Sequence, residues 1–166
     1  SKFRRENGER DFLPKLDDLY PHRFLDYPKI TGDYVVTADY HIPFCDYDLI
    51  NAMSAISVKM NVNKLIIAGD FFDGYLYSIF PKQTEGIKSE EEFTAAERIV
   101  EMLLDYFQEI VILMGSHDQR LLMLLENKMS VSRMFKLISG QIGKKIKVSQ
   151  YPYLHLNNKW RVTHPR

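Results

Sequence analysis

The fold of this chain is decided by the stretch Lys64–Asp73, which reads KLIIAGDFFD. Its first half, Lys64–Ala68, is rich in β-branched and aliphatic side chains, which predicts a short buried strand. Gly69 then allows close approach of the backbone, and the carboxylates Asp70 and Asp73 follow. In open α/β sheets, ligands and catalytic groups gather at the carboxyl ends of the strands. We therefore expect Asp70 to lie at a functional site.

Two other stretches share this arrangement of an apolar strand followed by polar residues. Tyr34–Ala38 leads into Asp39-Tyr40-His41, and Ile110–Met114 leads into Gly115-Ser116-His117-Asp118. The one-residue spacing within Asp39-Tyr40-His41 lets its carboxylate and imidazole point to the same side of an extended backbone. Carboxylate oxygens and imidazole nitrogens suit a divalent metal ion. The three stretches together predict a metal site at one edge of a sheet.

Helical segments separate the predicted strands. Asp46 can cap a helix that runs to about Met60, over which apolar residues recur at helical spacing. These residues are Leu49, Ile50, Met53, Ile56 and Met60. A second helix is predicted to begin near Ser89 and carries a stripe that we expect in the core, made of Phe93, Ala96, Ile99, Val100, Leu103, Leu104 and Phe107. A third helical region follows from Gln119 to about Ile138, and this alternation of strands and helices predicts an α/β fold.

The remaining segments predict a second sheet, a long loop and an extension. Short strands are expected between Lys145 and Thr163, with Asn157-Asn158 as a hairpin turn. The segment Gly74–Lys88 lacks a clear period and predicts a long loop of the kind that shapes substrate binding. Residues 1–33 are polar and interrupted by prolines. We expect them to form an amino-terminal extension packed on a domain that spans residues 34–166.

Composition limits the class of protein. The chain has 166 residues, 45% of them hydrophobic, which fits one folded domain and excludes a disordered chain. Lys and Arg total 22, as do Asp and Glu, and this balance argues against a general DNA-coating protein. The single cysteine, Cys45, fits a reducing compartment and hence a cytoplasmic location, and we expect it to be a buried apolar residue rather than a ligand. No apolar run reaches the ~20 residues of a membrane span.

The order and spacing of the three polar clusters resemble those of the calcineurin-like metallophosphoesterase family. The family pattern runs DxH, GDxxD, GNH[DE], a lone His after a strand, and finally GHxH. Here Asp39-Tyr40-His41 matches the first block, Gly69–Asp73 the second and Gly115–Asp118 the third except at Ser116, while His164 looks like the fourth. The resemblance implies a four-layer α/β/β/α sandwich. It also implies a hydrolase of phosphomonoesters or phosphodiesters, that is, a phosphatase or phosphodiesterase.

The resemblance also implies a two-metal centre. Asp39 and His41 would bind the first cation, and Asp70 would bridge to the second. Ser116 and His164 would belong to the second cation. His164 competes with His155 for this place, but His155 lies within an alternating run and reads as a strand residue. We expect Mn²⁺, with Zn²⁺, Fe or Ni²⁺ as alternatives, because mixed nitrogen and oxygen sites follow metal availability as well as affinity.

The catalytic roles carried over from the family belong to the third block. A hydroxide bridging the cations would attack phosphorus in line. His117 would stabilise the phosphoryl oxygens or protonate the leaving group, Asp118 would hold its ring, and Asp73 would organise the loop. Arg120 could bind a phosphate oxygen, and a solvated arginine on a helix face is an equal alternative. The partner would be a phosphoester substrate, with nucleotides and nucleic acids among the candidates, and no membrane partner is expected.

Two departures from the family pattern leave other functions open. Ser116 stands where the family has Asn, and a hydroxyl is shorter and usually a poorer neutral ligand than a carboxamide. The GHxH block is absent, and we expect that the domain is truncated at its carboxyl end. The alternatives are a catalytically weakened or inactive scaffold that binds a protein partner, which Ser116 favours, and a nuclease, which would need a basic groove.

Overall fold

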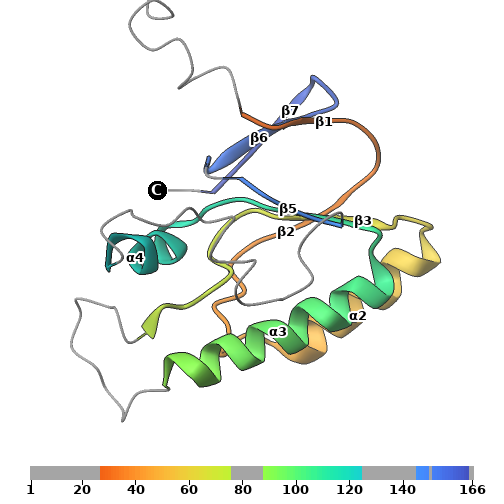
Figure 1. Cartoon of the computed structure of the whole chain (residues 1–166). Helices are drawn as coiled ribbons and strands as arrows, with labels where there is room; N and C mark the ends of the chain where they lie inside the picture. Colours follow the sequence, from red (N-terminus) through yellow and green to blue (C-terminus); the bar gives the residue numbers. More distant parts are fainter. Residues whose placement is uncertain (1–26, 76–87, 125–144, 150, 165–166) are drawn as a thin grey trace, which may run out of the picture.

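The central element of the fold is a four-stranded parallel sheet (Figure 1). The structure, a computed structural model, describes residues 27–75, 88–124, 145–149 and 151–164. The strands lie in the order β2-β3-β4-β5 and comprise β2 (Val35–Thr37), β3 (Lys64–Ile67), β4 (Glu109–Ile112) and β5 (Ile146–Val148). Each neighbouring pair is parallel. The three predicted strands that precede the polar clusters are therefore confirmed, and they lie side by side.

A second, three-stranded sheet has the order β1-β6-β7. It consists of β1 (Lys29–Ile30), β6 (Tyr153–Leu156) and β7 (Trp160–Thr163). The antiparallel pair β6-β7 is joined at Asn157 and Asn158, whose φ angles of 55° and 54° suit the tight turn that the sequence predicted. The parallel strand β1 lies within the segment that we assigned to the amino-terminal extension. That part of the segment is thus built into the second sheet.

The two faces of the central sheet are covered by different layers (Figure 1). Leu65 and Ile67 pack in a core cluster with α2 (Tyr47–Lys59) and α3 (Ser89–Tyr106). Ile66, which points to the opposite face, packs in a smaller cluster with Leu154 of β6. The chain has an α/β fold as predicted, with helices, central sheet and second sheet as three layers. The outer helical layer of the predicted four-layer sandwich remains a prediction.

Helix α3 buries the apolar stripe that the sequence predicted for it. Its Ala96, Ile99, Val100 and Leu103 are buried, together with Phe107 just beyond its end. Phe93 and Leu104 are partly buried against the same core. At the amino-terminal end, the Glu91 carboxylate accepts a hydrogen bond from the backbone N–H of Lys88 at 3.0 Å. The prediction for this helix is confirmed in both its position and its buried face.

Helix α2 buries a different face from the one its apolar series suggests. Asp46 is the N-cap, as predicted, and its Oδ1 accepts a hydrogen bond from the Leu49 N–H at 2.9 Å. The buried residues of the helix are Ile50, Ser54 and Ser57, and both serine hydroxyls donate to carbonyl groups of the preceding turn. Of the five apolar residues that predicted the helix, only Ile50 is buried.

Helix α4 (Ser116–Leu124) begins three residues earlier than predicted. This places Ser116, His117 and Asp118 in its first turn, close to the end of β4. The predicted helical residues beyond 124 and most of the predicted loop Gly74–Lys88 lie outside the described residues. Among the helices that are described, none is long and apolar enough to cross a membrane.

Candidate metal centre

The carboxyl ends of β2, β3 and β4 bring the three polar clusters together. The backbone N–H of Asp39 donates to the Gly69 carbonyl at 3.1 Å, and that of His41 donates to the Asp70 carbonyl at 3.0 Å. Asp39, His41 and Asp70 have φ angles of 57°, 46° and 50°. Residues other than glycine seldom adopt this left-handed conformation, and strained backbone of this kind clusters at functional sites. The local backbone therefore supports a functional role for these loops.

Two glycines make the close approach of these clusters possible. A Cβ atom at Gly69 would lie 2.7 Å from Cγ of His164 and 2.9 Å from Cα of Gly115. A Cβ atom at Gly115 would collide with the backbone nitrogen and Oδ1 of Asp70. Because glycine has no Cβ atom, the side chains of Asp70 and His164 can occupy this space. The two glycines thus determine where the central carboxylate and the buried imidazole lie.

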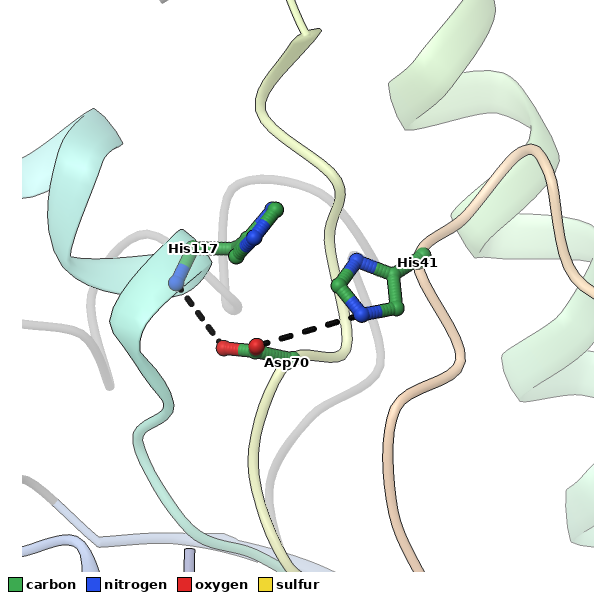
Figure 2. Close-up of side chains that lie close together, drawn as sticks. All are labelled: His41, Asp70 and His117. Atoms are coloured by element: carbon green, nitrogen blue, oxygen red, sulfur yellow. Dashed lines mark hydrogen bonds and ion pairs between the residues drawn. The ribbon is translucent and has the colours of Figure 1, made fainter. Parts of the chain in front are cut away.

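Asp70 lies at the centre of the site and is shared by two groups of potential ligands. Figure 2 shows Asp70 between His41 and His117, the other members of one group. One group is His41, Asp70 and His117, and the other is Asp39, Asp70 and His164; within each, the ligand atoms lie within 4.8 Å of one another. The family resemblance implied that Asp39 and His41 bind the same cation, whereas Asp39 is grouped here with Asp70 and His164. The two residues of the first cluster are nevertheless close, since His41 Nε2 lies 3.7 Å from Asp39 Oδ1.

The buried His164 points its Nε2 atom at the shared carboxylate. Its Nδ1–H donates to the Ala68 carbonyl at 3.0 Å, and Nε2 lies 3.2 Å from Asp70 Oδ2. A hydrogen bond at one ring nitrogen fixes the tautomer and leaves the other nitrogen available to a metal, as metal-binding histidines usually require. By contrast, His155 lies in β6 and stacks on Tyr27 with ring centroids 4.7 Å apart. His164 is the one of the two that reaches the site.

Asp73 holds the two other histidines of the site. Its Oδ1 accepts from His41 Nδ1 at 3.2 Å and lies 3.5 Å from His117 Nδ1, while its backbone carbonyl accepts from His117 Nδ1 at 2.7 Å. The rings of His41 and His117 meet edge to face with centroids 4.4 Å apart. Sequence reasoning gave Asp73 only a role in organising the loop. Its direct contacts with both rings could not be inferred from the spacing of residues in the sequence alone.

The guanidinium group of Arg120 lies against the ring of His117. Its two terminal nitrogens are each 3.1 Å from one of the two ring nitrogens, so the two groups are in direct polar contact. The same guanidinium donates to the Asp73 carbonyl at 3.5 Å. Arg120 is therefore at the site, as one of our two alternatives required, and its positive charge lies beside the metal-ligating candidates.

Ser116 and His117 contact Asp70 from the start of α4. The backbone N–H of His117 donates to Asp70 Oδ1 at 2.8 Å, and the Ser116 hydroxyl lies 3.3 Å from Oδ2 and 3.5 Å from Oδ1. A helix N-terminus favours a negative charge, so α4 helps to hold the carboxylate in place. The family resemblance implied that His117 stands outside the metal ligands, whereas its ring is close enough to join the group with His41 and Asp70.

Asp118 does not hold the ring of His117 as we predicted. Its Oδ1 accepts from the Phe72 N–H at 3.0 Å, and its Oδ2 accepts from the Gly115 N–H at 2.8 Å. Burial raises the pKa of the Asp118 carboxyl, although these backbone donors oppose the change. The carboxylate therefore joins the second and third clusters to each other, and the hydrogen-bond partner of His117 is Asp73.

Glu92 is a buried residue near the site that sequence reasoning missed. It is 3% exposed, and its Oε1 accepts a hydrogen bond from the Gly74 N–H at 2.8 Å. Burial raises the pKa of this carboxyl, and the nearby charges of Asp73 and Asp118 act in the same direction. We read the glutamates at the start of α3 only as favourable first-turn charges. A signal was present, because Glu92 precedes the first residue of the apolar stripe and lies on the same side as Ala96.

The donor set fits divalent cations. Three imidazoles and two carboxylates form the two groups that share Asp70. The Nδ1 atoms of His41 and His117 contact Asp73, and that of His164 contacts the Ala68 carbonyl. Such nitrogen and oxygen donors with hydrogen-bonded second nitrogens are typical of transition-metal ligands. Cys45, by contrast, is partly buried beside the hydrophobic core, and burial raises the pKa of its thiol.

Comparison with known proteins supports this assignment. The family model described as calcineurin-like phosphoesterase matches residues 33–163. No curated protein and no solved structure gave a significant match. The matched region contains all three polar clusters and ends one residue before His164. The chain belongs to the calcineurin-like phosphoesterase family.

Proposed function

We propose that this chain hydrolyses phosphomonoesters or phosphodiesters with the help of two divalent cations that share Asp70. The observation that carries this proposal is the overlap of the two ligand groups, since Asp70 belongs to both. Two-metal sites place cations ~3.5–4 Å apart, a spacing that one bridging carboxylate can span. Mn²⁺ is the cation we expect.

Within this proposal each residue at the site has a task. Asp39, Asp70 and His164 would hold one cation, and His41 and Asp70 would hold the other, with His117 within reach. Bound there, the cations would lower the pKa of a bridging water, so that a hydroxide is available as the nucleophile, and would neutralise charge on the phosphoryl group. Ser116 would orient the shared carboxylate through its hydroxyl.

His117 and Arg120 would act on the substrate side of the centre. The arginine, in contact with both ring nitrogens of His117, would supply a fixed positive charge for a phosphoryl oxygen. With Nδ1–H bonded to the Asp73 carbonyl, the doubly protonated imidazole would donate its Nε2–H to a phosphoryl oxygen or pass that proton to the leaving oxygen. Asp73 would keep both histidines in these orientations.

The test is hydrolysis of an aryl phosphate monoester and an aryl phosphate diester with added Mn²⁺. We expect turnover by the wild type and a loss of about 10³-fold in kcat/KM for Asp70→Asn, the upper end of what one electrostatic group contributes. Asp105→Asn, on the exposed side of α3, is the matched control and should be unaffected. Absence of both metal binding and turnover in the wild type would refute the enzyme proposal.

A second candidate function is a scaffold that keeps the fold without catalysis, and Ser116 is the observation that favours it. Its hydroxyl is engaged with Asp70, where the family has a carboxamide. We expect Ser116→Asn to tighten binding of the second Mn²⁺ in calorimetric titrations. Unchanged affinity and stoichiometry would mean that Ser116 does not limit the centre, and the scaffold function would lose its support.

A further inference from the structure

Helix α2 exposes large apolar side chains while it buries two serines. Leu49, Ile56 and Met60 are 65%, 54% and 69% exposed, whereas Ser54 and Ser57 are at most 1% exposed. Together with Met53, which is partly buried against the core, the exposed residues recur at intervals of four, three and four and form one stripe along the helix. Exposed apolar stripes of this length are uncommon on monomers and mark interaction surfaces.

The stripe lies beside the face of α2 that packs on the core. The buried residues of the helix are Ile50, Ser54 and Ser57, and Leu49, one residue before Ile50, projects about 100° away from it around the helix axis. The sheet under α2 has β2 as its outermost strand in the described part of the chain.

We propose that a second copy of this chain packs antiparallel against this stripe, so that the two α2 helices meet across a two-fold axis. In such a pair, Leu49 faces Met60 of the other copy and Met53 faces Ile56, and the reciprocal contacts follow from symmetry. All four residues of the stripe then contact an apolar partner. A self-complementary pattern of this kind is what an isologous interface requires.

The charges beside the stripe fit the same arrangement. Asp48 lies at the start of α2 and Lys59 at its end, and both are exposed on the same side of the stripe. In an antiparallel pair each Asp48 comes within one turn of Lys59 in the other copy. The net charge of zero also removes general repulsion between copies.

Sedimentation velocity of the full chain from about 1 to about 200 µM tests this proposal, because small interfaces associate in that range. We expect a monomer–dimer equilibrium. Ile56→Glu should weaken it by at least about 100-fold, since both copies would bury an unpaired charge. Val58→Glu is the matched control: Val58 is 59% exposed on the same helix but projects about 160° away from Ile56, so its dimer should persist.

Charge reversal tests the orientation of the pair. Asp48→Lys should weaken the dimer by roughly threefold to tenfold, and adding Lys59→Asp to the same chain should restore it. A chain that stays monomeric at every concentration, or equal effects of Ile56→Glu and Val58→Glu, would overturn the proposal. A monomer in which Ile56→Glu lowers the melting temperature far more than Val58→Glu would assign the stripe to another part of the same chain, which also overturns it.

Discussion

Asp70 and Asp118 lie at the same edge of the central sheet and are almost equally buried, at 4% and 1% exposure. Their partners differ. Around Asp70 are the imidazoles of His41 and His164 and the hydroxyl of Ser116, with one backbone N–H. Asp118 has the backbone N–H groups of Phe72 and Gly115. One carboxylate faces groups that can share a cation with it, and the other joins two loops.

The difference shows how a buried carboxylate can serve either chemistry or structure. Removing a carboxylate from water is costly, so its partners reveal what offsets the cost. Backbone donors satisfy Asp118 fully in the protein alone, and any change there should alter stability. The imidazoles around Asp70 already have hydrogen-bond partners at their Nδ1 atoms, which leaves Asp70 to interact with a cation. Changes there should alter metal binding more than stability.

The largest expected effect is on metal affinity at Asp70. Asp70→Asn should weaken Mn²⁺ binding by roughly 10³-fold, since removal of a single hydrogen-bond partner of a ligand already costs 10–100-fold and Asp70 is itself shared by two groups. Saturating Mn²⁺ should raise the free energy of unfolding of the wild type by ~2.7 kcal/mol at 100 times its Kd, but not that of Asp70→Asn. Calorimetric titration and chemical denaturation measure the two quantities.

Asp118→Asn is the matched variant for this comparison. It should keep Mn²⁺ affinity within about tenfold of the wild type, because the Asp118 carboxylate accepts from the backbone N–H groups of Phe72 and Gly115 rather than from a ligand side chain. Equal losses of affinity in the two variants would show that the site depends on the loops as a whole, and the distinction between the two carboxylates would fail.

The next effect is on stability at Asp118. Asp118→Ala leaves the N–H groups of Phe72 and Gly115 without acceptors, and each buried donor without a partner costs about 1–3 kcal/mol. We expect the free energy of unfolding of the metal-free protein to fall by ~3 kcal/mol, and that of Asp70→Ala to fall by less. Urea denaturation at neutral pH measures both. A larger loss in Asp70→Ala would reverse the assignment of structural and chemical roles.

A smaller effect is expected at Asp73, which lies between these extremes. Asp73→Ala removes the acceptor at His41 Nδ1, and loss of such a partner lowers metal affinity or activity by about 10–100-fold. His117 keeps its bond to the backbone carbonyl, so the loss should stay below that of Asp70→Asn. Asp73→Asn retains an acceptor oxygen and should recover part of the activity. No difference between the two variants would remove Asp73 from the positioning of the histidines.

The sequence was enough to predict Asp70 because its position follows from a rule about strands. A run of aliphatic residues predicts β3, and the end of a parallel strand is where ligands lie, so Asp39, His41 and Asp70 could be expected to meet. The same reasoning placed the hairpin at Asn157-Asn158. These features depend on local pattern and strand order alone.

The partners of buried groups could not be read in the same way. Asp118 was assigned to His117 because they are adjacent in sequence, but consecutive residues in the first turn of a helix project in different directions. One oxygen of the Asp118 carboxylate instead accepts from the backbone N–H of Phe72, 46 residues away in the sequence. Helix α2 shows the same limit: its apolar series predicted a helix, but packing against α3 and the sheet decided that Ser54 and Ser57 would be buried.

The smallest effect we predict is a change in the pH dependence of stability at Glu92. This is the third buried carboxylate, and like Asp118 it accepts a hydrogen bond from a backbone N–H. Because burial raises its pKa, the folded protein binds this proton more tightly than the unfolded chain. The stabilising contribution is complete below the ordinary value of 4.5 and is lost as the pH rises through the raised pKa. Glu92→Gln should flatten this decline in the free energy of unfolding of the chelator-treated protein. Glu97→Gln, exposed on the same helix, should keep the wild-type slope; a Glu92→Gln slope equal to it would mean that Glu92 binds no extra proton on folding.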